Sequence, residues 1–188
     1  MIQFFSDLYW KFQGWKIVGT YPSELKKMMI VIAPHTSWVD ILIGFAARKR
    51  LKINHAKFLG KKEIFEGFFG KWLLKLGGVP VDRHAKLGAV EQVVQYYNNN
   101  EEFIIGMSPE GTRKRIDKLK TGFYYMAKNA NVPILLLGFD FKNKEVLIAE
   151  PFYATDNEEE DFNKIIAFFS TIEGYNPEKD MRHLAKKS

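Results

Sequence analysis

Short apolar stretches alternate with amphipathic stretches along most of this 188-residue chain, and this alternation limits what it can fold into. Short runs rich in Val, Ile and Phe are typical of strands, and apolar residues spaced by three and four predict helices. We expect strands at 17–21, 28–33, 53–59, 79–81, 102–107, 133–138 and 145–149. We expect helices at 37–49 with Ser37 as cap, at 62–76 with a break near Gly67 or Gly70, and at 85–97, 122–129 and 158–171. This order predicts an α/β fold in a single domain, with a central, mixed, mostly parallel sheet flanked by helices.

The composition excludes several classes of protein. Hydrophobic residues make up 46% of the chain, enough to build a core, so intrinsic disorder is excluded. The sequence contains no cysteine, which excludes disulfides, Cys-ligated metals and a cysteine nucleophile. Its longest apolar runs, such as 28–34, are far shorter than the roughly 18–20 residues that span a bilayer. Asp7, Lys11 and Lys16 interrupt the N-terminal segment, so we do not expect a signal peptide there.

The net charge of +6 is unevenly distributed. Residues 1–128 contain 21 Lys and Arg against 11 Asp and Glu, whereas residues 129–188 contain 7 against 11. A basic first part favours an anionic partner, such as nucleic acid, a lipid surface or a phosphorylated small molecule. A basic surface that only keeps the protein soluble is the alternative. Since the chain carries no nucleic-acid motif, we do not expect nucleic acid to be the partner.

Residues 1–15 predict a short amphipathic helix ahead of a domain at 16–188. Phe5, Leu8, Phe12 and Trp15 recur at helical spacing, and Phe4, Tyr9 and Trp10 add further aromatic side chains to the segment. Trp and Tyr near lysines are typical of a helix that lies in a membrane interface. The alternative is a terminal helix that packs its aromatic side chains on the core of its own domain.

The segment 34–40 carries the first candidate chemistry, because it joins an expected strand to an expected helix, where open α/β sheets bind ligands. His35 would lie in the loop and Asp40 in the first helical turn. A carboxylate that accepts the imidazole Nδ1–H fixes the tautomer and leaves Nε2 free as a general base. The alternative is structural, since Ser-x-x-Asp at 37–40 also matches a helix-capping pattern.

Two further segments contain glycine and arginine in patterns suited to anions. Ser-Pro-Glu-Gly-Thr-Arg at 108–113 follows an expected strand, and Arg113 offers a planar fork for phosphate that Glu110 could orient. Gly-Gly-Val-Pro-Val-Asp-Arg at 77–83 ends on a second arginine, Arg83. Ordinary turns with solvated charges are the alternative for both segments.

Taken together and in this order, the segments resemble the signature blocks of the lysophospholipid (glycerophosphate) acyltransferase family. The blocks are His-x4-Asp at 35–40, Gly-Val-Pro-Val-Asp-Arg at 78–83, Pro-Glu-Gly-Thr-Arg at 109–113 and, more weakly, Val-Pro-Ile-Leu-Leu at 132–136. Lys-Lys-Glu-Ile-Phe at 61–65 and Lys-Thr-Gly at 120–122 extend the similarity, which covers about residues 15–150.

The resemblance implies transfer of an acyl group from acyl-CoA or an acyl-carrier-protein thioester to the hydroxyl of a lysophospholipid, such as 1-acyl-glycerol-3-phosphate. No metal ion, cofactor or acyl-enzyme is implied. His35 would deprotonate the acceptor hydroxyl, and Asp40 would orient His35. A protein of this kind is expected on the cytoplasmic side, attached peripherally to a membrane surface by its N-terminal helix.

The same resemblance implies a set of substrate-binding residues. Glu110, Gly111, Thr112 and Arg113 would hold the polar head of the acceptor. Arg83 would bind the phosphate, and Lys61 would bind phosphate or developing oxyanion charge. Lys120, which follows the third block, would also bind substrate.

The sequence departs from the family pattern at four positions. Pro34 precedes the histidine where many members carry Asn, and Ser108 stands where many carry Phe. Pro80 interrupts a usually apolar stretch, and Gly67 replaces a common Pro. Since these loops shape the head-group site, two alternatives stay open: another acceptor, such as a lyso-aminolipid or a different lysophospholipid, and a non-catalytic lipid-binding domain.

Overall fold

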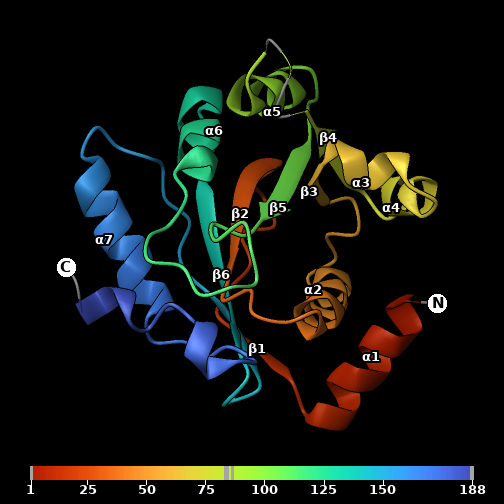
Figure 1. Ribbon diagram of the computed structural model, residues 1–188, viewed down its shortest axis with the longest axis vertical. Helices are drawn as coiled ribbons and strands as arrows, with labels where there is room; N and C mark the ends of the chain where they lie inside the picture. Colours follow the sequence, from red (N-terminus) through yellow and green to blue (C-terminus); the bar gives the residue numbers. More distant parts are fainter. Residues whose placement is uncertain (1, 83–84, 86, 187–188) are drawn as a thin grey trace.

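The computed structural model describes residues 2–82, 85 and 87–186. In this part of the chain seven strands form one sheet in the order β1-β7-β6-β2-β5-β3-β4 (Figure 1). The strands are β1 Lys16–Val18, β2 Lys27–Ala33, β3 Lys57–Lys61, β4 Gly78–Val81, β5 Phe103–Met107, β6 Ile134–Asp140 and β7 Glu145–Ile148. Neighbouring strands are parallel except for β6 and β7, which are antiparallel. The predicted α/β class and the mixed, mostly parallel sheet are therefore confirmed.

Helices cover both faces of the sheet, as Figure 1 shows. They are α1 Ile2–Gln13, α2 Val39–Arg50, α3 Lys62–Glu66, α4 Gly70–Lys75, α5 Ala89–Asn98, α6 Gly122–Ala130 and α7 Glu158–Phe169, followed by 3-10 turns at Pro177–Lys179 and Leu184–Lys186. Helices α1 and α2 share one core cluster, and α5, α6 and α7 share the other. The pleat of β2 sends Met28 and Ile30 to the first cluster and Met29 and Val31 to the second. Burial on both faces explains why β2 and β6 are almost uniformly apolar.

Several predicted boundaries differ from the structure. Strand β3 begins at Lys57 rather than at 53, because the chain turns after α2, where Lys52 has a φ of 59° and the Ile53 N–H donates to the Arg48 carbonyl. The helix predicted at 62–76 does break, into α3 and α4. A Cβ at Gly70 would lie 1.7 Å from the Phe65 carbonyl oxygen, so only glycine fits at this break.

Two helix starts also differ. Helix α2 has Trp38 as its N-cap instead of Ser37, although the Ser37 Oγ accepts the Val39 N–H. Helix α5 begins at Ala89 instead of 85, and Gly88 is its N-cap.

The parallel strands bring the predicted motifs to one edge of the sheet. Strands β2 and β5 are neighbours in register, with Val31 opposite Met107, so the loops that follow them meet. The loop at residues 34–38, which carries the predicted base and is called the catalytic loop below, follows β2. The loop at residues 108–121, which carries the predicted anion-binding arginine and is called the anion loop, follows β5. The carboxyl edge of a parallel sheet is where such folds bind ligands.

Candidate active site

His35 and Asp40 form a contact pair at the start of α2. The His35 Nδ1 lies 3.1 Å from the Asp40 Oδ2, and the histidine side chain is 26% exposed while the carboxylate is buried. The same Oδ2 accepts the Ser37 N–H at 2.8 Å. The two interpretations of the Ser-x-x-Asp pattern are thus compatible, because one oxygen both holds the loop and faces the imidazole. With Nδ1–H directed at Asp40, Nε2 is left as the hydrogen-bond acceptor of the ring.

Glu110 lies beneath this pair and is only 2% exposed. Both of its carboxyl oxygens lie 3.0 Å from the His35 backbone N–H, which donates to them. The pKa of Glu110 is raised to about 8, mainly by burial and also by the charges of Asp40 and Asp180, while the hydrogen bond from the His35 N–H opposes the shift. The geometry therefore gives Glu110 a role in holding the catalytic loop, whereas the resemblance had implied contact with the acceptor head.

Arg113 projects from the anion loop towards the histidine. Its Nε donates to the His35 Nε2 across 3.3 Å, and both side chains reach solvent at this point. A fixed positive charge therefore lies directly beside the atom that would take up a proton. An acceptor whose hydroxyl replaces the Arg113 Nε–H at Nε2 would have an anionic group near the guanidinium.

The other residues of the third block shape the anion loop. Gly111 has a φ of 62°, and a Cβ there would lie 2.9 Å from the Lys120 Nζ, so glycine allows Lys120 to pack close. The Lys120 N–H donates to the Pro109 carbonyl and closes the loop. The Thr112 hydroxyl accepts the Lys114 N–H, which is a local turn contact.

The predicted site residue Lys61 is not part of this cluster. Lys61 is the exposed last residue of β3, and at a strand spacing of about 4.8 Å it lies roughly 10 Å across the sheet from β2. Arg83 lies outside the described residues.

Sequence reasoning missed Asn176, which reaches the catalytic loop from the end of the chain. Its side-chain Nδ2 donates to the Thr36 carbonyl at 2.8 Å, and its N–H donates to the Thr36 hydroxyl at 3.0 Å. An Asn-Pro pair at 176–177 signals a turn, but no local pattern indicates a contact across 140 residues.

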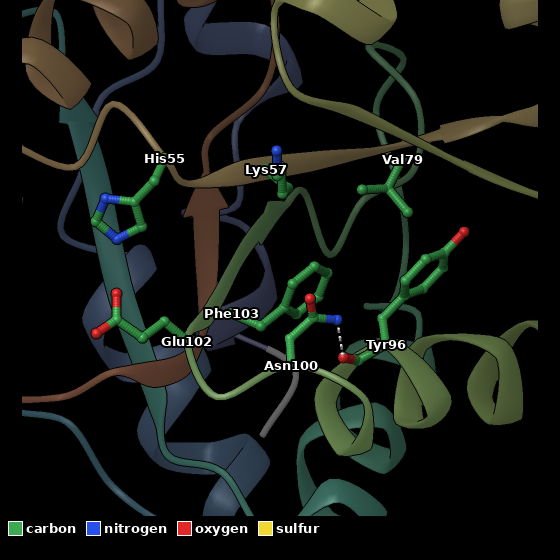
Figure 2. A pocket seen from close by; sticks show the side chains of 7 residues that line it. All are labelled: His55, Lys57, Val79, Tyr96, Asn100, Glu102 and Phe103. Atoms are coloured by element: carbon green, nitrogen blue, oxygen red, sulfur yellow. Dashed lines mark hydrogen bonds between the residues drawn. The ribbon is translucent and has the colours of Figure 1, made fainter.

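A surface pocket lies at the opposite edge of the sheet (Figure 2). Lys57 begins β3 and Phe103 begins β5, so the pocket lies at the amino ends of these strands. Figure 2 also shows Asn100, whose amide donates to the Tyr96 carbonyl at 2.7 Å. Since no residue of the His35 cluster lines this pocket, we assign the chemistry to the carboxyl edge.

Comparisons with known proteins show what the chain is similar to. The sequence model of the Acyltransferase family matches residues 15–138, which contain both loops. A comparison with curated proteins finds no match. Among solved structures, the chain is similar to PlsC, a 1-acyl-sn-glycerophosphate (LPA) acyltransferase from Thermotoga maritima, with 19% sequence identity and a TM-score of 0.57. The similarity covers 88% of this chain and 74% of that one.

Proposed function

The chain belongs to the Acyltransferase family, and from this premise we propose that it acylates the hydroxyl of a lysophospholipid with an acyl thioester as donor. The observation that carries the proposal is the position of His35, whose Nδ1 faces buried Asp40 while its Nε2 faces the Arg113 guanidinium. A base with a carboxylate partner and an adjacent anion site suits an acceptor that carries a hydroxyl and a phosphate close together.

The proposed reaction is a direct transfer in one ternary complex. The His35 Nε2 removes the proton of the acceptor hydroxyl, and Asp40 stabilises the resulting imidazolium. The acceptor oxygen attacks the thioester carbonyl carbon and forms a tetrahedral oxyanion. Collapse of this intermediate breaks the carbon–sulfur bond, and the leaving thiolate takes up the proton from His35. The products are an ester and a free thiol of CoA or carrier protein.

Cationic side chains along the carboxyl edge would bind the anionic parts of both substrates. Arg113 and Lys120 lie in the anion loop, and we assign both to the acceptor phosphate. Lys61 is farther along the edge, where it suits the phosphates of the donor or the developing oxyanion. Arg83 is assigned to phosphate on its sequence motif alone.

The favoured acceptor is 1-acyl-glycerol-3-phosphate, whose free hydroxyl and phosphate are on adjacent carbons. PlsC, which has a similar fold, is an acyltransferase for this substrate, and Arg113 beside Nε2 fits the same arrangement. Other lysophospholipids, a lyso-aminolipid acceptor and a lipid-binding domain without catalysis are the competing possibilities. A phosphate monoester gains most from a guanidinium at this position, since it has three terminal oxygens and up to two negative charges, whereas a phosphodiester has two free oxygens and one charge.

We further propose that the protein works at a membrane surface on the cytoplasmic side, where acyl thioesters are available. Within the described residues no helix combines the length and apolarity needed to cross a bilayer. Helix α1 packs on α2 through Trp10, which is buried, whereas Phe12 on its outer face is 85% exposed. The turn between α3 and α4 exposes Phe68 (96%) and Phe69 (66%).

Both apolar surfaces lie on the α2 side of the molecule in Figure 1. Lys11 accompanies the aromatic side chains of α1, and Lys71 and Lys75 accompany those of α4. Aromatic side chains beside lysines fit the interface of an anionic bilayer. Contact through these two surfaces would deliver a lipid acceptor to the sheet edge.

A product assay with mass detection tests the proposed function. Wild-type protein and His35→Ala are incubated with several lysolipid acceptors and with acyl-CoA and acyl-carrier-protein donors in parallel. We expect a new diacyl lipid with wild type and its loss in His35→Ala. Equal product formation by the two proteins would refute the base mechanism, and no product from any wild-type pairing would leave lipid binding as the better hypothesis.

A further inference from the structure

Three consecutive residues of the catalytic loop are each held by a side chain from a different part of the chain. The His35 N–H donates to Glu110, and the Ser37 N–H donates to Asp40. Between them, Thr36 is held by Asn176 at two points. The Asn176 side-chain amide donates to the Thr36 carbonyl, and the Asn176 backbone N–H donates to the Thr36 hydroxyl. Thr36 is 3% exposed, so both contacts are shielded from water. Asn176 therefore completes the fixation of the loop.

Asn176 belongs to a C-terminal strap, which we define as residues 173–184. Gly174 lies so close to the catalytic loop that a Cβ there would be 3.1 Å from the Thr36 hydroxyl and 3.2 Å from the Pro34 Cβ. Buried Asp180 stiffens the strap, because it accepts the Arg182 Nε at 2.7 Å and lies 3.5 Å from the Gly174 N–H. A strap this tightly packed can hold its partners in fixed positions.

The other end of the strap contacts the anion loop. The His183 Nε2 lies 2.7 Å from the carbonyl oxygen of Ile116, three residues after Arg113. One ring nitrogen of a neutral histidine carries a proton, so His183 can donate to this carbonyl. The strap thus touches both loops of the candidate site, although it lies outside residues 15–138, which match the family.

We propose that the strap is a positioning element of the active site, in which Asn176 holds the loop of His35 and His183 holds the loop of Arg113. This inference rests on the proposed acyl transfer. A general base must stay within about 0.5 Å of its productive position, and a displacement of about 1 Å can cost on the order of 100-fold in rate. Asn176 acts through Thr36 on the base, whereas His183 acts through Ile116 on the acceptor site, so the two contacts affect different kinetic constants.

The first test is steady-state kinetics of Asn176→Ala. We expect kcat to fall about 10- to 100-fold while the acceptor KM stays within about twofold. The matched control is Asn157→Ala, which removes the side-chain cap of α7 from the Glu160 N–H. The control should lower the unfolding temperature but leave kcat unchanged, so the split between kcat and KM separates positioning from stability.

The second test is His183→Ala, for which we expect a higher acceptor KM and a kcat close to wild type. His55→Ala is its control, since His55 is exposed in the pocket at the opposite edge of the sheet. The control should leave both constants unchanged.

Failure of the strap proposal can be told from failure of the proposed function. If wild type forms no ester product, the proposed function fails and the strap proposal falls with it. If wild type is active and folded Asn176→Ala keeps its kcat within about twofold, the strap proposal alone is wrong. Should Asn176→Ala not fold, Asn176→Ser keeps a short polar group, and an unchanged kcat in that variant would overturn the proposal equally.

Discussion

The two loops of the candidate site follow neighbouring parallel strands, yet they are built in opposite ways. In the catalytic loop Thr36 and Ser37 are buried, and the side chains of Asp40, Glu110 and Asn176 hold its backbone. The anion loop buries Glu110 and Leu119 but exposes the side chain of Arg113. A fixed loop suits a base whose position determines the rate, whereas an exposed cation suits reversible binding of a charged acceptor.

The largest effect is expected from removing the base or its partner. His35→Ala and Asp40→Asn should lower kcat by about 10²- to 10⁴-fold, because a general base and its orienting carboxylate act on the transition state. Thermal unfolding monitored by circular dichroism should show that both variants remain folded. If either folded variant keeps the wild-type kcat, the catalytic loop does not contain the base.

A smaller effect on a different constant is expected from Arg113→Ala. Loss of a charge-assisted hydrogen bond to phosphate costs about 1.5–3 kcal/mol, so the acceptor KM should rise about 10- to 100-fold. Arg115→Ala, in the same exposed loop, is the control. A fall in kcat at constant KM would place Arg113 on the reacting atoms instead of the head group.

The outer face of α1 offers a test of the membrane proposal. Phe4→Ser combined with Phe12→Ser should weaken sedimentation with anionic liposomes about tenfold or more, because both side chains lose contact with the bilayer. Tyr153→Ser changes an exposed aromatic side chain elsewhere and should have no effect. Unchanged binding of the double variant would assign α1 to the fold alone.

The smallest effect on rate is expected from Glu110→Gln. Glutamine keeps an acceptor for the His35 N–H and resembles the neutral carboxyl that a pKa of about 8 implies near pH 7. Most activity should remain, and the acceptor KM should not change. A raised KM would instead support the head-group role that the sequence resemblance implies.

The same substitution has a signature in stability. The folded-state pKa of Glu110, about 8, is above its ordinary value of 4.5, so the native state holds a proton that the unfolded chain has released between these values. The stabilisation that comes from this bound proton is fully present below about pH 4.5. It decreases as the pH rises to about 8, by at most about 1.4 kcal/mol per pH unit. Relative to Glu110→Gln, wild type should therefore lose unfolding free energy across this window in urea titrations.

The parts of the fold and site that depend on local pattern were predictable from the sequence. The alternating stretches indicated the mostly parallel sheet, and the motifs indicated which segments carry the candidate chemistry. The direction in which Glu110 faces was not predictable, because a Pro-Glu-Gly turn is compatible with a carboxylate on either side. Its partner, His35, is 75 residues away in the chain.

Long-range packing also divided the aromatic residues of the N-terminal segment. Helical spacing grouped Phe5, Leu8, Phe12 and Trp15, but the structure exposes only the first three, and Trp15 lies beyond the end of α1. Trp10 and Trp15 turn inward and share a core cluster with α2. The two interpretations of this segment therefore apply to different faces, a division that spacing alone does not reveal. The contact between Asn176 and Thr36 depends likewise on tertiary packing.

One measurement tests the difference between the two loops most directly. The ratio of kcat/KM for 1-acyl-glycerol-3-phosphate to that for monoacylglycerol is determined for wild type, Asp40→Asn and Arg113→Ala. We predict that Asp40→Asn slows both acceptors equally and keeps the wild-type ratio, whereas Arg113→Ala brings the ratio close to one. A ratio that Asp40→Asn changes and Arg113→Ala leaves intact would contradict the assignment of rate to the catalytic loop and acceptor binding to the anion loop.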